Sequence, residues 1–276
     1  MHRSVLVFRD FRYLKLTVVL VLAAIVAYLL HRPFGAANGG TWLGYTLGTI
    51  GALLIVWLGW FGIRKRRYGV GKLLLEDWLS AHVYLGLGLL VIATLHTGFQ
   101  FGWNVHTLAY ALMVLVIASG AFGLFAYVRY PRLMTENRGG LTLGEIMTNI
   151  AELDGQCRDV GMKLGDEINA AVLRAAGETR IGGGVWRQLS GTDPNCATSR
   201  ALALVQEGTR DLTGDAANAA NRLMTLLSRK VELLARARRD VRYKALMDIW
   251  LYVHVPLTIA LLAALFTHVV SVFFYW

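Results

Sequence analysis

The 276-residue sequence is poor in cysteine, proline and charge. Its two cysteines are too few for a disulfide-stabilised secreted scaffold. Its four prolines fit long helices better than a loop-rich β structure. Only 17% of the residues are charged, against about 25% in soluble proteins, and 55% are hydrophobic. This composition excludes an ordinary soluble domain. It also argues against a nucleic-acid partner despite the net charge of +10, because nucleic-acid-binding surfaces lie on polar folds.

Long stretches without Asp, Glu, Lys or Arg mark where the chain would cross a membrane. They cover residues 16–31, 41–63, 78–128 and 249–276. A transmembrane helix needs about 20 apolar residues, so the third stretch is long enough for two helices. We therefore predict five spans, at about 14–31, 42–63, 78–99, 106–128 and 246–273. The first is expected to be retained, because no small-residue cleavage site of a signal peptide follows it.

Basic residues flank these spans unevenly. Arg32 alone lies on one side of the predicted membrane, and ten basic residues lie on the other. Cations accumulate on the cytoplasmic side of membrane proteins. The sequence therefore predicts a cytoplasmic N-terminus and a C-terminus on the outer face, in what we expect to be a bacterial inner membrane. The ten are Arg3, Arg9, Arg12, Lys15, Arg64, Lys65, Arg66, Arg67, Lys72 and Arg129.

Most of the charge lies in one block, residues 131–244, which holds 17 of the 28 basic and 14 of the 18 acidic residues. Apolar residues recur at steps of three and four over 146–164 and 212–226, which is typical of coiled-coil seams. A glycine-rich stretch separates the two series. The block is predicted to form a long, antiparallel, cytoplasmic helical hairpin between spans 4 and 5. Cys157, on the first seam, is expected to be a buried free thiol.

The predicted fold is therefore an all-α integral membrane bundle with an inserted hairpin. Its expected parts are 1–130 with spans 1–4, 131–244 with the hairpin, and 245–276 with span 5.

Four of the seven histidines lie inside predicted spans. His82 and His96 are fourteen residues apart in span 3, and His254 and His268 are fourteen apart in span 5. Fourteen residues make about 3.9 helical turns and about 21 Å of rise, so each pair lies on one face of its helix. Spans 3 and 5 run in the same direction. His82 is therefore predicted to lie level with His254 near the cytoplasm, and His96 level with His268 near the outer face.

Two layers of paired imidazoles are what two stacked haems require, with one histidine of each helix on each iron. Histidine inside a bilayer is costly and usually functional, although a single one also fits an interhelical hydrogen bond. A zinc site would need ligands converging on one point, with cysteines or carboxylates nearby. We predict that His82 and His254 bind a cytoplasmic-side haem b, and that His96 and His268 bind an outer-side haem b.

Three further residues are candidate haem contacts. Gly86 would leave room for a flat macrocycle, but close helix packing explains a glycine there equally well. Arg129 on the inner side and Arg32 on the outer side are candidate partners for the propionates. Basic residues beside spans also serve as topology determinants. A ladder of small residues in span 2 is interpreted as helix packing: Gly44, Gly48 and Ala52.

The four histidines resemble those of the dihaem b-type cytochromes. Their spacing on two parallel spans is similar to that in the respiratory cytochrome b of the quinol-oxidising complex. Their place on the third and fifth spans looks more like the transmembrane core of the ferric reductases and NADPH oxidases. The resemblance covers the five spans and not 131–244. A reductase of that family carries a sixth span and a flavin- and nicotinamide-binding domain, whereas no Gly-x-Gly-x-x-Gly follows a predicted strand here.

The resemblance implies an electron-transfer function. We expect the membrane cytochrome b subunit of a redox complex, with a soluble redox protein or sister subunits docking on the hairpin. The alternative is an oxidoreductase that oxidises quinol or reduces a metal at a haem edge, with His106 and His31 accepting protons and quinone as a partner. A third hypothesis is a haem-linked sensor or scaffold that signals through the hairpin.

Overall fold

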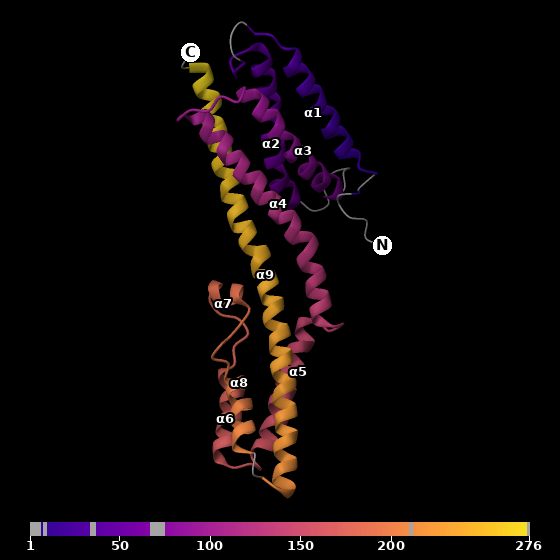
Figure 1. Ribbon diagram of the computed structural model, residues 1–276, viewed down its shortest axis with the longest axis vertical. Coiled ribbons are helices and arrows are strands. Elements are labelled where there is room, and N and C mark those ends of the chain that lie inside the picture. The colour runs from indigo at the N-terminus through magenta and orange to yellow at the C-terminus, as the bar shows by residue number, and fades with distance from the viewer. Residues whose placement is uncertain (1–6, 8–9, 34–36, 67–74, 210–211, 275–276) are drawn as a thin grey trace. The chain divides into compact units, whose positions relative to one another are not determined.

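The computed structural model describes residues 7, 10–33, 37–66, 75–209 and 212–274. Regular structure in these ranges is entirely helical, which confirms the all-α prediction. Figure 1 labels the helices as α1 (Arg12–Leu30), α2 (Trp42–Arg66), α3 (Leu75–Thr97), α4 (Val105–Arg138), α5 (Leu143–Gly161), α6 (Asp166–Glu178), α7 (Val185–Ser190), α8 (Ala197–Gly208) and α9 (Gly214–Phe274). Four of the basic residues used to predict sidedness lie outside the described residues: Arg3, Arg9, Arg67 and Lys72.

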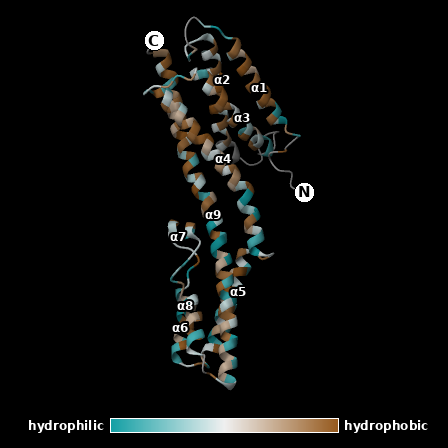
Figure 2. Ribbon diagram, in the orientation of Figure 1, coloured by the Kyte–Doolittle hydropathy of each residue, from teal (hydrophilic) through white to brown (hydrophobic). Residues whose placement is uncertain are grey.

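Five of these helices are long and apolar enough to cross a membrane, namely α1, α2, α3, α4 and α9. Each overlaps one of the predicted spans, so the number of candidate spans is the expected one. Figure 2 shows apolar residues along α1, α2 and α3, and a change from polar to apolar along α9. The sidedness of the spans stays a prediction.

The chain divides into two compact units. The first comprises Met1–Leu124 and Trp250–Trp276, and the second comprises Phe125–Ile249. Both borders lie inside continuous helices, α4 and α9, and so do the borders expected at 130/131 and 244/245. The change from apolar to charged sequence does not end either helix, and α4 continues through Pro131 at the expected border.

In the first unit, α3 packs against both α1 and α2. The core between these helices contains Ala24, Leu43, Leu47, Ile92 and Leu95. Gly88 allows α1 and α3 to approach closely, since a Cβ there would lie 2.6 Å from Cγ2 of Thr17. A second core cluster is formed by residues of α2, α3, α4 and α9, namely Leu58, Leu89, Met113 and Leu261.

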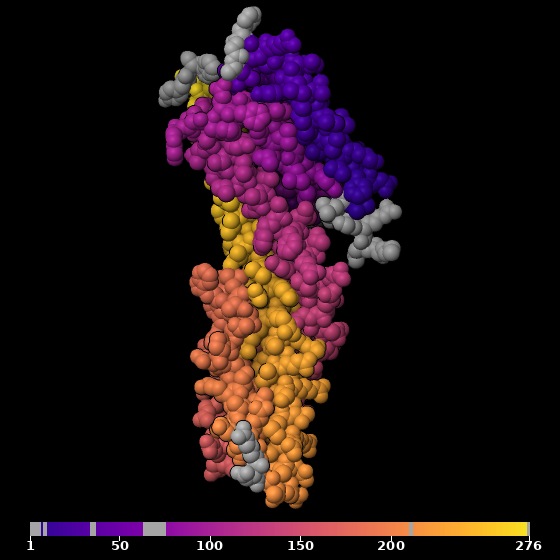
Figure 3. All heavy atoms as spheres, in the orientation of Figure 1, coloured from indigo at the N-terminus to yellow at the C-terminus, as the bar shows by residue number. Residues whose placement is uncertain are grey.

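The second unit differs from a simple two-armed hairpin. A capping box between Thr142 and Glu145 starts α5, and the chain turns back at Gly165, whose φ of +99° favours glycine. The short helices α6 and α8 then pack on one another and share a core with α5 and α9. The later part of the apolar series predicted over 146–164 lies in this core, with Cys157 0% exposed. The earlier part, Ile146, Ile150 and Leu153, lies in a separate cluster of the same unit. Figure 3 shows the outer surface of this unit with all its heavy atoms.

A charged side chain lies inside the core of the second unit. Lys230 is 1% exposed, and its Nζ donates to Oδ1 of Asp154 at 2.5 Å and to the carbonyl of Ala175 at 2.8 Å. It continues the buried stripe of α9 made by Leu223, Leu227 and Leu234. The two acceptors make it possible to bury a positive charge that would otherwise be strongly unfavourable.

Both cysteines of this unit are free thiols, as predicted for Cys157. Burial raises the pKa of Cys157 to about 11. Burial would also raise the pKa of Cys196, but hydrogen bonds from the Arg238 guanidinium and the nearby backbone outweigh it and lower that pKa to about 7. The Nη2 atom of Arg238 lies 3.3 Å from the Cys196 sulfur.

Candidate functional site

The predicted site lies in the first unit, and His96 near the end of α3 is held most closely. Its Nδ1 lies 2.8 Å from the backbone carbonyl of Gly44 in α2. A carbonyl oxygen can only accept a hydrogen bond, so Nδ1 carries the proton and donates it. The lone pair of this imidazole is therefore on Nε2, the nitrogen that a metal can use.

Glycines bring the backbone of α2 against this ring. A Cβ at Gly48 would lie 2.6 Å from Cε1 of His96, and a Cβ at Gly39 would lie 3.2 Å from the same atom. Gly44 has no room for a side chain either, because its Cβ would lie 2.4 Å from the Asn38 carbonyl. The small residues interpreted as helix packing thus also hold an imidazole.

His268 of α9 lies opposite His96. The two ring centroids are 6.1 Å apart and the ring planes are at 86°. Two imidazoles on opposite sides of one iron, each with its nitrogen about 2 Å from the metal, would have centroids about 6 Å apart. His96 and His268, the pair predicted for the outer haem, are therefore spaced as two imidazoles bound to one iron would be.

His268 has a second neighbour that the sequence did not indicate as its partner. Its Nδ1 lies 2.5 Å from Nδ1 of His106, the second residue of α4. The two ring centroids are 4.6 Å apart, with the planes at 87°. His31, the other histidine expected to accept protons, instead packs edge-on against Trp42 at 5.1 Å.

His254 of α9 is oriented by α4. Its Nδ1 lies 2.7 Å from Oγ of Ser119, and the same Oγ lies 2.8 Å from the carbonyl of Val116. Serine has one hydroxyl proton, which goes to the carbonyl, so the serine oxygen accepts from the histidine. His254 therefore also carries its proton on Nδ1. A Cβ at Gly120 would come within 3.5 Å of this ring.

Trp250 fixes the same region of α9. Its Nε1 donates to the carbonyl of Ser119 at 2.8 Å, and its ring lies 5.5 Å from that of His254. A Cβ at Gly123 would lie 2.1 Å from the indole, so only glycine lets the tryptophan sit there. This anchor was not predicted, because a tryptophan near a span end looks like an interfacial residue.

His82 differs from the other three. Its ring packs against Phe61 of α2 with centroids 5.0 Å apart, and its Nδ1 is buried without a hydrogen-bond partner. It lies close enough to His254 for the two to interact electrostatically. The rings of these two make no direct contact in the described part of the chain. His82 and His254, the pair predicted for the inner haem, thus lack a ring contact such as that between His96 and His268.

These residues fit a haem. The donors are four imidazoles on two helices, and three of them have Nδ1 engaged, which leaves Nε2 available to iron. In the described ranges no three His, Cys, Asp or Glu side chains are grouped so as to hold a metal ion, so a zinc-type site has no candidate there. A bis-histidine haem needs only two protein ligands.

No protein-family model, curated protein or solved structure matches the chain. The assignment of the site therefore rests on its own residues and geometry.

The structure gives less support to the three other predicted haem contacts, Gly86, Arg32 and Arg129. A Cβ at Gly86 would meet nothing within 4 Å, so this position has open space beside it. Arg32 is exposed directly after α1. Arg129 is exposed as well and belongs to the second unit. Within the part of the chain that the structure describes, none of the three forms a hydrogen bond or ion pair with His82, His96, His254 or His268.

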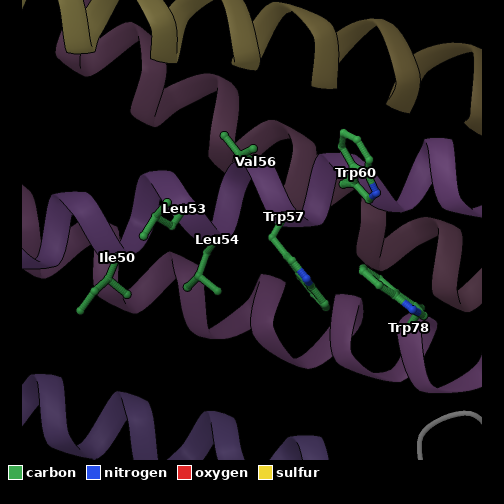
Figure 4. A pocket seen from close by; sticks show the side chains of 7 residues that line it. All are labelled: Ile50, Leu53, Leu54, Val56, Trp57, Trp60 and Trp78. Atoms are coloured by element: carbon green, nitrogen blue, oxygen red, sulfur yellow. The ribbon is translucent and has the colours of Figure 1, made fainter. Parts of the chain in front are cut away.

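An apolar hollow lies along α2, next to Trp78 of α3. It has a volume of about 690 Å³ and is lined by Ile50, Leu53, Leu54, Val56, Trp57, Trp60 and Trp78 (Figure 4). Trp57 and Trp78 stack with centroids 4.7 Å apart and planes at 17°. The Nε1 of Trp78 is buried without a partner. The hollow thus offers flat aromatic surfaces.

Gly48→Ala is expected to displace the His96 ring, because the added Cβ would lie 2.6 Å from it. The expected result is a roughly tenfold weaker retention of haem at this layer, the lower end of the effect of disturbing a ligand's surroundings. Haem per chain after detergent purification measures it. Gly62→Ala in the same helix is the matched control, since a Cβ there meets nothing within 4 Å. Equal haem content in both variants would contradict the prediction.

Proposed function

We propose that the chain is the membrane cytochrome b subunit of a redox complex. It would transfer electrons through two b-type haems, one bound by His82 and His254 and the other by His96 and His268. The observation that carries the proposal is the proximity of His96 and His268, whose ring centroids are 6.1 Å apart. The resemblance of the four histidines to those of dihaem cytochromes supports the same function.

The chain's own residues bind and orient. The Gly44 carbonyl and Ser119 hydroxyl hold Nδ1 of their histidines and leave Nε2 for the iron. Bound haem supplies the one-electron chemistry, while the protein sets its position and surroundings.

The partners and orientation follow from the sequence. The ten-to-one distribution of basic residues supports a cytoplasmic N-terminus and a cytoplasmic second unit, in a bacterial inner membrane. A soluble redox protein or a sister subunit would dock on that unit. Its mixed positive and negative charge, 17 basic and 14 acidic residues over 131–244, suits a protein partner better than a nucleic acid.

The protein purified from membranes is expected to contain two b-type haems per chain. A reduced-minus-oxidised spectrum identifies the haem type, and a pyridine haemochrome assay gives the stoichiometry. Dithionite should reduce both haems. A colourless protein would overturn the proposal. So would a haem content that does not change when the four histidines are substituted.

A second candidate function is the direct oxidation of quinol at the inner haem. The Trp-lined hollow favours it, because its volume of about 690 Å³ is within the range of small-molecule sites. Trp78 and His82 are one helical turn apart on α3, so the hollow is next to the ligand. Adding a short-chain quinol in place of dithionite distinguishes the two: reduction by quinol alone supports this candidate, and no reduction supports a protein donor.

A further inference from the structure

His106 is placed by the start of α4. Asn104 precedes the helix, and its Oδ1 accepts from the backbone N–H of Thr107 at 3.0 Å. The Thr107 hydroxyl accepts in turn from the Gly102 backbone at 3.1 Å. Such capping satisfies the first free N–H groups of a helix and fixes where it begins. The second residue of α4, His106, is therefore held at a defined position.

The contact between His106 and His268 has one chemically consistent direction. Two Nδ1 atoms 2.5 Å apart require one to donate and the other to accept. If His268 binds iron through Nε2, its proton is on Nδ1, and it must be the donor. His106 then accepts on Nδ1 and carries its own proton on Nε2. Its ring is exposed, whereas that of His268 is half-buried.

Each of the other oriented histidines donates to an oxygen. His96 donates to a carbonyl and His254 to a hydroxyl. An imidazole nitrogen is a stronger base than a carbonyl or hydroxyl oxygen. A histidine that donates its N–H to this nitrogen therefore becomes a more electron-rich metal ligand. His268 would accordingly be a more electron-rich ligand than its counterparts.

We propose that His106 is a positioning residue that fixes the tautomer of His268 and lowers the reduction potential of the haem bound by His96 and His268. This inference rests on the proposed function, and it identifies a residue that tunes the reduction potential of one haem relative to the other. An electron-rich ligand stabilises ferric over ferrous iron, so the outer haem becomes the weaker electron acceptor. His106 acts through His268 and does not itself bind the metal.

The test uses the full-length protein with both haems. His106→Leu removes the acceptor at similar volume, and His106→Gln keeps an acceptor oxygen. His31→Leu is the matched control, because His31 packs on Trp42 and not on a ligand histidine. The readouts are the two midpoint potentials by redox titration at one fixed pH, the low-temperature α-bands and the haem content.

His106→Leu is expected to make reduction of one haem about tenfold more favourable, which is about 59 mV for a one-electron couple. His106→Gln should shift less, and His31→Leu should leave both potentials unchanged. Two retained haems with unaltered potentials and bands in His106→Leu would overturn the inference while leaving the proposed function intact. Loss of the outer haem in His106→Leu but not in His106→Gln supports the positioning role. A wild-type protein without haem would overturn both.

Discussion

His96→Ala is expected to reduce the haem content from two per chain to one. The imidazole is one of two ligands on the proposed outer iron, and its Nδ1 is fixed by the Gly44 carbonyl. Alanine offers no ligand and leaves His268 alone with the metal. A b-type haem is held by its axial ligands and by packing, so losing one ligand of two should release it. Haem per chain and the split of the α-band give the result.

The pairing of the four histidines is tested by comparing variants. His268→Ala should remove the same spectral component as His96→Ala, and the double variant should lose no more, because residues that form one site are not additive. His254→Ala should remove the other component. His31→Ala is the matched control for losing an imidazole outside the site. If His96→Ala and His268→Ala removed different components, the assigned pairs would be wrong.

Lys230→Met is expected to destabilise the second unit by about 3 kcal/mol. Methionine keeps much of the volume but removes the donor to Asp154 and to the Ala175 carbonyl. Breaking a buried ion pair from one side costs about 3–5 kcal/mol, because the remaining charge is uncompensated. The lower figure is appropriate here, since the Asp154 side chain is 21% exposed and keeps some solvation.

Thermal unfolding of the full-length protein, followed by its helical signal, measures this effect. Lys163→Met makes the same chemical change at an exposed position of the same unit and should alter stability by less than about 0.5 kcal/mol. Adding Asp154→Asn to Lys230→Met should recover part of the loss by removing the unpaired charge. A Lys230→Met protein that unfolded with the wild-type midpoint would show that the ion pair contributes nothing.

The membrane-spanning helices could be predicted from the sequence because hydropathy alone determines them. The span predicted at 14–31 corresponds to α1 at Arg12–Leu30, and that at 78–99 to α3 at Leu75–Thr97. The helical placement of the four histidines followed from the same patterns. The fourteen-residue spacing then predicted which of them share a level, and the structure brings His96 and His268 together.

The partners of the histidines could not be predicted, because they depend on which helix faces lie side by side. Gly44 and Gly48 form a ladder that indicates only close packing, and nothing in the sequence says that the neighbour is an imidazole. Ser119 sits in an apolar span without any motif. His106 was noted for its position near the membrane surface, whereas its contact with His268 joins residues 162 positions apart.

The second unit was predicted only in part, for two reasons. Periodicity indicated the seam on α5, but it cannot show that the segment between the arms folds into helices α6 and α8 of its own. A lysine in an apolar stripe also looks like an exposed position. Only the facing Asp154 and Ala175 explain why Lys230 is buried.

The hydrogen bonds on the histidine Nδ1 atoms have a consequence for how the protein would assemble. His96, His254 and His268 are held by neighbouring helices through contacts that involve only the chain itself. The rotational freedom of these rings is thus lost when the helices pack, and not when a ligand enters. A ligand that meets rings already in position binds with a smaller entropic cost. Folding of the bundle would accordingly come first, and haem insertion would follow into a site whose ligands already point the right way.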